Sequence, residues 1–478
     1  MSSLFEMTVL CSGKSFIAAV FRPVHDLHAG LSLPKLKVPH ILGLPDELLS
    51  EIFSHLVDPW FSTFNRRNPV WALTKVCVRW REIAVHDPRF WRDINCRDWI
   101  ADDIEKTSTH SNYSRAVNRT ELQVSRSAQA PLTLELIPGP APTLTYDIFA
   151  RLLASSDRLE SAILILDNNL MQRFLEHKAG FPALKRLRIA STDEQDEAIP
   201  KLLQGLTALE DLRFVDQLRP QWLPSLVPVW NRLNNCELKH CVVDDVLLVM
   251  PHFLPGTRLA IVSGLFARDL ESLKPVEECH IFSLSFDQCN DMYITEVLNN
   301  TTAPSLKRLA IWQYQREPFD TLSAMLTRSS AALTHLALGL PSISNVPDFD
   351  VTSTISLLAF LNSSHGESLV DLDLQLFDSY HSANNHLVKS LALIPSTWQL
   401  APHLPLPSLP NLRALALRGY MDDGYDGERR LLMFAAHHYP VLQSLWIEGA
   451  LPVFSKKSIE ALHDHGVEFV RSYDMGWW

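Results

Sequence analysis

The stretch Leu184-Lys185-Arg186-Leu187-Arg188-Ile189 carries a phrase of six residues, with apolar side chains at the first, fourth and sixth positions. Leu209-Glu210-Asp211-Leu212-Arg213-Phe214 repeats it. Further clear copies lie at 306–311, 333–338, 369–374, 412–417 and 442–447, and weaker copies at 131–136, 159–164, 233–238, 254–259 and 281–286. Between residues 159 and 333 the copies start 25, 25, 24, 21, 27, 25 and 27 residues apart. This near-constant period predicts an array built from one short structural unit.

Each copy predicts a short β-strand. The alternating apolar residues at its end bury one row of side chains, and the variable residues between them face outward. A single unit cannot bury its leucines, whereas a stack of units can. The period lies in the range of leucine-rich repeats, and Cys241 and Cys289 fall near the position where such repeats carry Asn or Cys. We therefore predict an α/β fold for residues 130–478, a curved leucine-rich-repeat-like solenoid with a parallel sheet on its concave face.

The alternative for this region is a conventional α/β domain whose leucines are simply core residues. The regular period favours the repeats, because leucine-rich helices and strands are common but a constant spacing between them is not. Beyond residue 333 the starts spread to 36, 43 and 30 residues apart, and the proline-rich segment 395–410 lies in the widest gap. That segment is predicted to be an exposed loop.

A different pattern occupies residues 44–56 near the start of the chain. Pro45 suits the first position of a helix, where its missing N–H costs nothing, and Asp46 and Glu47 lie where the helix dipole favours negative charge. The apolar residues that follow recur on one helical face, namely Leu48, Leu49, Ile52, Phe53 and Leu56. A second amphipathic stretch carries Val76, Trp80, Ile83 and Ala84 in the same way. Two short helices with wide apolar faces must pack on each other and on something else.

These residues resemble an F-box, the adaptor-binding module of SCF-type ubiquitin ligases. The Leu-Pro at 44–45, the Leu-Leu at 48–49, the Ile-Phe at 52–53, the Val-Cys at 76–77 and Trp80 occur in the order of that family, and Pro88 and Trp91 continue its fungal form. More residues than usual separate Leu56 from Val76, so an exposed loop is expected there. An F-box followed by degenerate leucine-rich repeats resembles the substrate-receptor subunits of these ligases. The alternative is a pair of ordinary amphipathic core helices.

Together these patterns divide the chain into four parts. Residues 1–39 are a leader of uncertain structure, 40–95 the helical F-box domain, 96–129 a linker and 130–478 the repeats. The net charge of −11 argues against a general nucleic-acid binder, which needs a basic surface to displace counterions. Seven scattered cysteines fit a reducing compartment, and no apolar run is long enough to span a bilayer. A cytoplasmic or nuclear protein without a membrane partner is expected.

The sequence contains no complete catalytic or metal-binding motif. Ser12-Gly13-Lys14-Ser15 resembles the end of a phosphate-binding loop, but Thr8 stands where the upstream glycine is required. His463 and His465 point to different sides of the expected terminal helix, which argues against a metal site. Cys236 and Cys241 lack a second pair at zinc spacing. We therefore expect no enzyme activity, no cofactor and no metal.

The repeat phase identifies the residues that project from the concave sheet, at the third, fifth and seventh positions of each copy. In the first half of the array these include Arg186, Arg188, Arg213, Arg258, Arg308 and Trp312, with Asp211 as an exception. The second half offers a more acidic set, His335, Asp371, Asp373, Gln375, Arg418, Trp446 and Glu448. Because arginine binds carboxylates and phosphates through two parallel hydrogen bonds, the first half is a candidate surface for an acidic or phosphorylated target segment. The alternative is that these arginines are solvated or pair with neighbouring carboxylates.

The resemblance implies a non-catalytic substrate receptor that joins a Skp-type adaptor, and through it a cullin–RING ligase, to a target protein. The adaptor-facing residues would be Leu44, Pro45, Leu48, Leu49, Ile52, Phe53, Leu56, Val76, Trp80 and Ile83, with Trp91 as a further candidate. Two other functions remain open. One is a leucine-rich scaffold whose F-box-like helices only cap the array, since solenoids need capping elements. The other is an α/β enzyme, which predicts a pocket with clustered titratable groups.

Overall fold

The computed structural model describes residues 43–57, 61–65, 68–96, 110–137, 142–177, 180–191, 198–215, 219–265, 275–276, 278–312, 318–339, 356–357, 359–376, 409–419, 441–448, 456–464 and 466–471. The predicted leader at 1–39 lies outside these residues, as does nearly all of the proline-rich segment at 395–410. The chain divides into two compact units, Met1–Phe53 and Ser54–Trp478, which are described separately.

The first unit contributes most of helix α2, Asp46–Ser54. The helix begins one residue after Pro45, whose carbonyl accepts the hydrogen bond of the Leu49 amide at 3.1 Å. Asp46 and Glu47 occupy its first turn, as the sequence predicts.

The second unit contains a single sheet of fourteen parallel strands among the described residues, and each strand pairs only with its neighbours in sequence. The strands are β1 Asp93–Cys96, β2 Leu132–Leu136, β3 Leu159–Leu166, β4 Arg186–Ser191, β5 Asp211–Phe214, β6 Asn235–Lys239, β7 Arg258–Val262, β8 Ser283–Asp287, β9 Arg308–Trp312, β10 His335–Gly339, β11 Asp371–Leu376, β12 Ala414–Gly419, β13 Ser444–Glu448 and β14 Glu468–Arg471.

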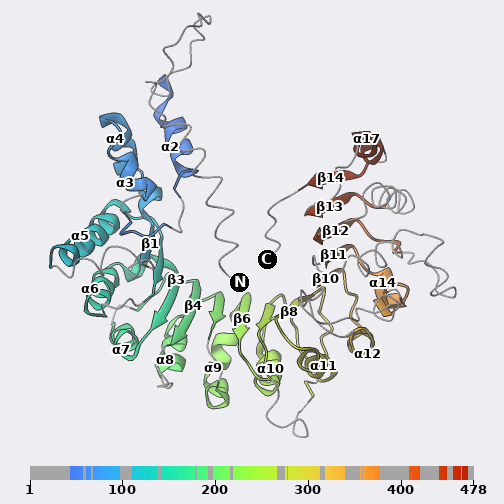
Figure 1. The fold of residues 1–478 in the computed structure, drawn as a ribbon. Helices are drawn as coiled ribbons and strands as arrows, with labels where there is room; N and C mark the ends of the chain where they lie inside the picture. Colours follow the sequence, from blue (N-terminus) through green and yellow to red (C-terminus); the bar gives the residue numbers. More distant parts are fainter. Residues whose placement is uncertain are drawn as a thin grey trace, which may run out of the picture. The chain divides into compact units, whose positions relative to one another are not determined.

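Helices connect most of these strands. The α-helices of the second unit are α3 Pro69–Leu73, α4 Val78–His86, α5 His110–Arg126, α6 Pro142–Leu153, α7 Asn168–Glu176, α8 Ala198–Gly205, α9 Leu223–Trp230, α10 Val243–Val249, α11 Asp291–Asn299, α12 Phe319–Ser329, α14 Ser364–Glu367 and α17 Lys456–Asp464. The 3-10 turns are η3 Pro88–Trp91, η4 Ser156–Arg158, η5 Pro220–Trp222 and η6 Met250–His252. From α6 to α12 each α-helix contacts the next, and all of them lie on one side of the sheet (Figure 1). We call the opposite side the open face.

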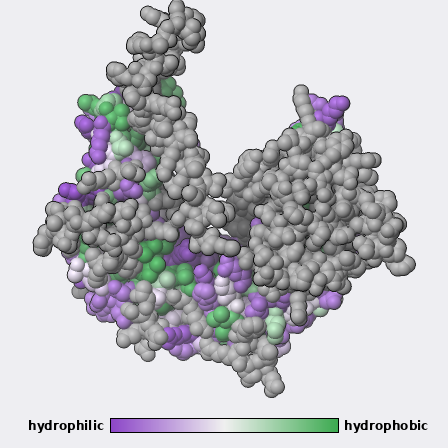
Figure 2. Space-filling view, in the orientation of Figure 1, coloured by the Kyte–Doolittle hydropathy of each residue, from purple (hydrophilic) through white to green (hydrophobic). Residues whose placement is uncertain are grey.

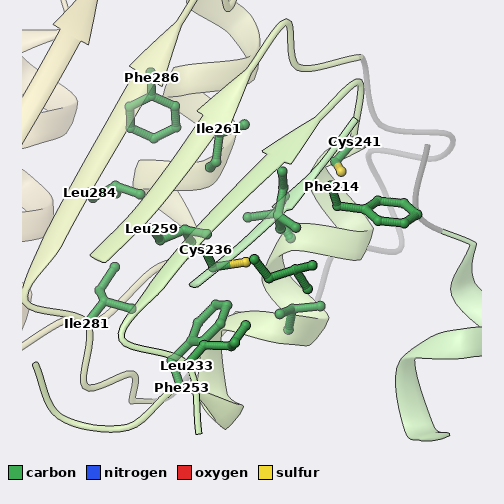
Figure 3. Close-up of a cluster of buried hydrophobic side chains, with 14 of the residues drawn as sticks. Phe214, Leu233, Cys236, Cys241, Phe253, Leu259, Ile261, Ile281, Leu284 and Phe286 are labelled. Atoms are coloured by element: carbon green, nitrogen blue, oxygen red, sulfur yellow. The ribbon is translucent and has the colours of Figure 1, made fainter. Parts of the chain in front are cut away.

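The strand register confirms the phase of the six-residue phrase. Its third positions form one continuous ladder, in which Arg186 of β4 pairs with Asp211 of β5 and Arg308 of β9 pairs with His335 of β10. The apolar fourth and sixth positions lie on the helix side and are buried, as Figure 3 shows for the cluster around Leu259, Ile261 and Phe286. The same backbone conformation follows three successive strands, because the residues immediately after β6, β7 and β8 all have a φ between 52° and 55°: His240, Ser263 and Gln288.

The weak copy placed at 254–259 is wrong by two residues. Strand β7 starts at Arg258, which pairs with Asn235 and Ser283 and therefore occupies the third position, not the fifth. Leu254 is 49% exposed and precedes a turn at Gly256, whose φ of +98° favours glycine. The copy therefore starts at Gly256, and the two irregular spacings around it become 23 and 25 residues.

The sheet also begins earlier than predicted. Strand β1, at 93–96, pairs with β2, and the segment expected to be a linker at 96–129 contains the long helix α5. The sequence obscured this strand because the copy holding Ile94 and Cys96 is separated from the next by about forty residues. Likewise, the insertion before Val76 is not simply an exposed loop. It contains helix α3, and the side chains of Ser62 and Thr63 are fully buried.

Candidate functional site

Helix α2 exposes apolar side chains that folding leaves uncovered. Leu48 is 52% exposed and Ile52 is 37% exposed, whereas Leu49 and Phe53 of the same helix are completely buried. The four residues thus fall into two pairs on different sides of the helix. Pro45 is exposed as well, and Leu44 and Leu56 are half-buried. Of the α2 residues predicted to contact an adaptor, Leu49 and Phe53 are therefore inaccessible in this structure.

A second exposed apolar set lies at the start of α4. Val76 is 43% and Val78 is 65% exposed, and Figure 2 shows hydrophobic surface over this helix. The Val-Cys and Trp of the sequence pattern have a local explanation, because Cys77 caps α4 by accepting a hydrogen bond from the Trp80 amide at 3.5 Å. Trp80 is buried and Ile83 is half-buried, so Trp80 packs inside the protein and is not part of the exposed surface of α4. The sequence pattern did not single out Val78, although it stands two residues after Val76.

The segment carrying α3 and α4 is joined directly to the sheet. The guanidinium of Arg126, on α5, lies over the rings of Trp91 and Trp71 at 4.5 and 5.7 Å. Asn95 of β1 donates to a Glu135 carboxylate oxygen at 2.8 Å, and its carbonyl accepts from the amide of Thr63 at 2.8 Å. Trp91, the further adaptor candidate, is fully buried and donates from its indole to the Ala84 carbonyl at 2.6 Å. These contacts fix the α3–α4 segment of the second unit to strands β1 and β2.

The open face of β4–β7 carries the predicted arginines. Arg186, Arg188, Arg213 and Arg258 are all exposed, and the register places Arg188 directly opposite Arg213. Like charges on directly opposed residues destabilise a sheet. One carboxylate partly compensates them, since Arg213 lies 3.6 Å from Glu237.

Asp211 interrupts this row of arginines. Partial burial raises the pKa of its carboxyl, although the charges of Arg213 and Arg186 pull the pKa downward. Asp211 is thus a partly buried carboxyl among exposed arginines.

Arg308 and Trp312, on β9, differ from the other four predicted binding residues because they are half-buried. The Nε of Arg308 is buried and has no hydrogen-bond acceptor among the described residues. Trp312 leans across the neighbouring strand, since a Cβ added to Gly339 would lie 2.5 Å from its ring. The structure thus separates β9 from the exposed arginines of β4–β7.

The buried cysteines are structural. Burial raises the pKa of the Cys279 thiol to about 12 and that of Cys289 to about 11, so both stay protonated and unreactive near neutrality. Cys241 and Cys289 occupy equivalent positions after β6 and β8, and each thiol donates to a carbonyl of its own strand at 3.4 Å. Each of these two cysteines lies two residues beyond the end of its strand and donates back to that strand.

Comparison with known proteins identifies one region. Residues 41–97 match the family described as F-box-like, and this range contains α2, α3, α4 and β1. No curated protein matches the sequence. Within the described residues, none of the helices combines the length and the apolar character needed to cross a membrane.

Proposed function

We propose that this chain is a non-catalytic substrate-recognition subunit of an SCF-type cullin–RING ubiquitin ligase. One observation carries the proposal: the F-box-like region keeps Leu48 and Ile52 exposed on α2 after folding has buried Leu49 and Phe53. Exposed apolar side chains gathered in one place mark interaction surfaces. In the family this surface binds a Skp-type adaptor. Val76 and Val78 form a separate exposed apolar pair on the second unit, which is a second candidate for contact with the adaptor. The complex acts by bringing target lysines close to a conjugating enzyme, in the cytoplasm or the nucleus.

The second unit is then the target-binding part, a solenoid of degenerate leucine-rich repeats. Its support is the one-unit-per-strand order of the sheet, the ladder of equivalent positions and the recurring turn after β6, β7 and β8. Such arrays present extended surfaces to their partners. Within it, the exposed arginines of β4–β7 are the proposed binding surface for an acidic or phosphorylated segment of the target.

Co-purification with the Skp-type adaptor tests the receptor function. The double variant Leu48→Asp/Ile52→Asp should lose adaptor binding by about a hundredfold or more, because two apolar anchors are replaced by charges. The control is Leu248→Asp/Met292→Asp, which changes two exposed apolar residues on α10 and α11 (51% and 56% exposed). Adaptor binding that survives in the α2 variant would favour the rival interpretation, a scaffold whose F-box-like helices only cap the array.

Charge reversal tests the arginine surface separately. Arg186→Glu with Arg213→Glu should weaken target capture while leaving adaptor binding intact. Because Arg213 also pairs with Glu237, the control is Glu237→Gln, which frees the arginine without removing it. Target capture that is equal in wild type and the double variant would reject these arginines as the target site.

The remaining rival, an α/β enzyme, predicts a cluster of titratable groups with shifted pKa values in a pocket. The shifted groups among the described residues are mostly buried thiols and Tyr293 on the helix side, and carboxyls such as Asp211 whose shift follows from partial burial. No observation on these residues favours a reaction over binding.

A further inference from the structure

The open face of β9–β12 is hollowed where its fifth positions are alanine. Ala337 and Ala416 are 9% and 4% exposed, although they lie on the face away from the helices. Larger residues surround them, so the short side chains form the floor of a pocket. The space within it, including its opening to solvent, is about 500 Å³. The sequence contained the signal, since alanine recurs at the fifth position at 310, 337 and 416, but the residue type alone suggested nothing to bind.

The walls combine an aromatic side chain with charged ones. Trp446 of β13 bounds one end, and the third positions of β9, β10 and β11 form an edge of Arg308, His335 and Asp371. The Nε2 of His335 lies 2.5 Å from an Asp371 carboxylate oxygen, and its Nδ1 lies 2.8 Å from the Thr334 hydroxyl. The carboxylate of Asp371 therefore already has His335 as its partner at the edge of the pocket.

Within the part of the chain that the structure describes, Arg308 is the charged group of this edge for which no hydrogen bond or ion pair is found. Its buried Nε has no acceptor, and no ion pair of its guanidinium exists among the described residues. Asp373, deeper in the pocket, is 7% exposed and has an interaction of its own within the chain. Asp371 lies two strands from Arg308, about 10 Å at a strand spacing of about 4.8 Å. An unmatched arginine beside an apolar floor is complementary to a carboxylate attached to an apolar group.

We propose that this pocket anchors the target protein by an apolar side chain on the floor of Ala337 and Ala416, with an acidic residue of the same segment bound to Arg308. The proposal rests on the receptor function and specifies its target. An extended segment advances about 3.3 Å per residue. Because Ala337 is one strand from Arg308 and Ala416 is three strands away, the acidic residue lies within about four residues of the apolar one. The carboxylate lies toward β9 and the apolar group toward Trp446.

The test uses a displayed library of random twelve-residue peptides and the full chain co-purified with its adaptor. The enriched peptides should carry Asp or Glu within about four residues of a large apolar residue. Their affinity, measured by fluorescence anisotropy, should fall about tenfold or more in Ala337→Phe, which fills the pocket, and in Arg308→Gln, which removes the charge-assisted hydrogen bonds. The matched controls are Ala332→Phe, an exposed alanine before β10 that lies outside the pocket and the arginine surface, and Lys201→Gln, on α8, and both should bind as the wild type does.

If Ala337→Phe folds poorly, a double-mutant cycle between Arg308 and the acidic residue of the peptide still tests the proposal. Replacing the acidic residue of an enriched peptide by its amide should weaken binding to the wild type but not to Arg308→Gln. The proposal would be overturned if the losses of affinity in the cycle were additive, or if the peptide bound Ala337→Phe as well as the wild type. It would also be overturned if the library enriched basic peptides, peptides without an acidic residue, or no sequence at all. Adaptor co-purification is measured on the same samples, so loss of the receptor function is distinguished from loss of the pocket.

Discussion

Two stretches of the open face, β4–β7 and β9–β12, share one backbone arrangement and differ in what they present. The register places Arg188 and Arg213 in the same row as Ala310 and Ala337. In the first stretch this row consists largely of long charged side chains, which stand exposed. In the second it consists of short side chains that lie below their neighbours and are buried without facing the helices. The same repeat therefore presents a charged ridge in one stretch and a hollow floor in the other, according to which side chains occupy this row and its neighbours.

The largest expected effect tests whether the two stretches really share their core. Leu212 of β5 and Leu336 of β10 lie at the fourth position of their copies and are 0% and 1% exposed. Leu212→Ala and Leu336→Ala should each lower the free energy of unfolding by about 2–5 kcal/mol, because both leave a cavity on the helix side. Urea denaturation followed by circular dichroism measures this. If only one of them destabilised the chain, the difference between the stretches would extend into the core.

An enlarged alanine tests the difference on the open face itself. Ala310 of β9 is completely buried, whereas Ala260, at the equivalent position of β7, is only partly buried. Ala310→Leu should cost about 1–3 kcal/mol through overpacking, while Ala260→Leu should cost much less. The same denaturation measurement compares them. Equal costs would mean that the space above Ala310, which lies outside the pocket, is as open as the space above Ala260.

Sequence patterns could predict the strands and their register, but not how exposed each side chain of the open face is. The phrase at 184–189 and at 306–311 predicted both strands and the direction of every side chain, because a period of two fixes the face. It could not predict that Arg186 is exposed while Arg308, at the equivalent third position, is half-buried, since the exposure of a side chain depends on its neighbours as well as on its face. At 254–259 the leucine pattern misled, because Gly256 and Thr257 fill positions that leucine and its neighbour hold elsewhere.

In the F-box-like region, too, the sequence predicted the helix but not which of its side chains are exposed. The sequence placed Leu48, Leu49, Ile52 and Phe53 on one apolar face of a helix. The structure divides them into exposed and buried pairs, which a broad apolar face on a helical wheel cannot reveal. Strand β1 was missed because four residues give too short a pattern when the neighbouring copy is far away in the sequence.

A smaller effect concerns the ion pair that partly neutralises the charged ridge. Arg213 and Glu237 are 52% and 28% exposed, and their charged atoms lie 3.6 Å apart. A double-mutant cycle of Arg213→Gln and Glu237→Gln should give a coupling free energy of about 0.2–1 kcal/mol, since solvent screens the pair. The coupling should shrink when salt is raised. A coupling that is large and independent of salt would show that the ridge is already satisfied by its own carboxylates, and would argue against an anionic target there.

The smallest expected effect is the dependence of stability on the ionisation of Asp211. Partial burial raises the pKa of this carboxyl in the folded chain, against the opposing pull of Arg213 and Arg186. A raised pKa means that the folded state disfavours the charged form of Asp211. The resulting loss of folding stability is absent below the pKa of the unfolded chain and appears as the pH rises through the pKa of the folded chain. Asp211→Asn should therefore match the wild type near pH 3.5 and become slightly more stable than it toward pH 7. Denaturation across this range measures the difference, with the exposed Asp157→Asn as control. An asparagine variant that is less stable at pH 7 would show that the arginines of the ridge, and not burial, dominate the surroundings of Asp211.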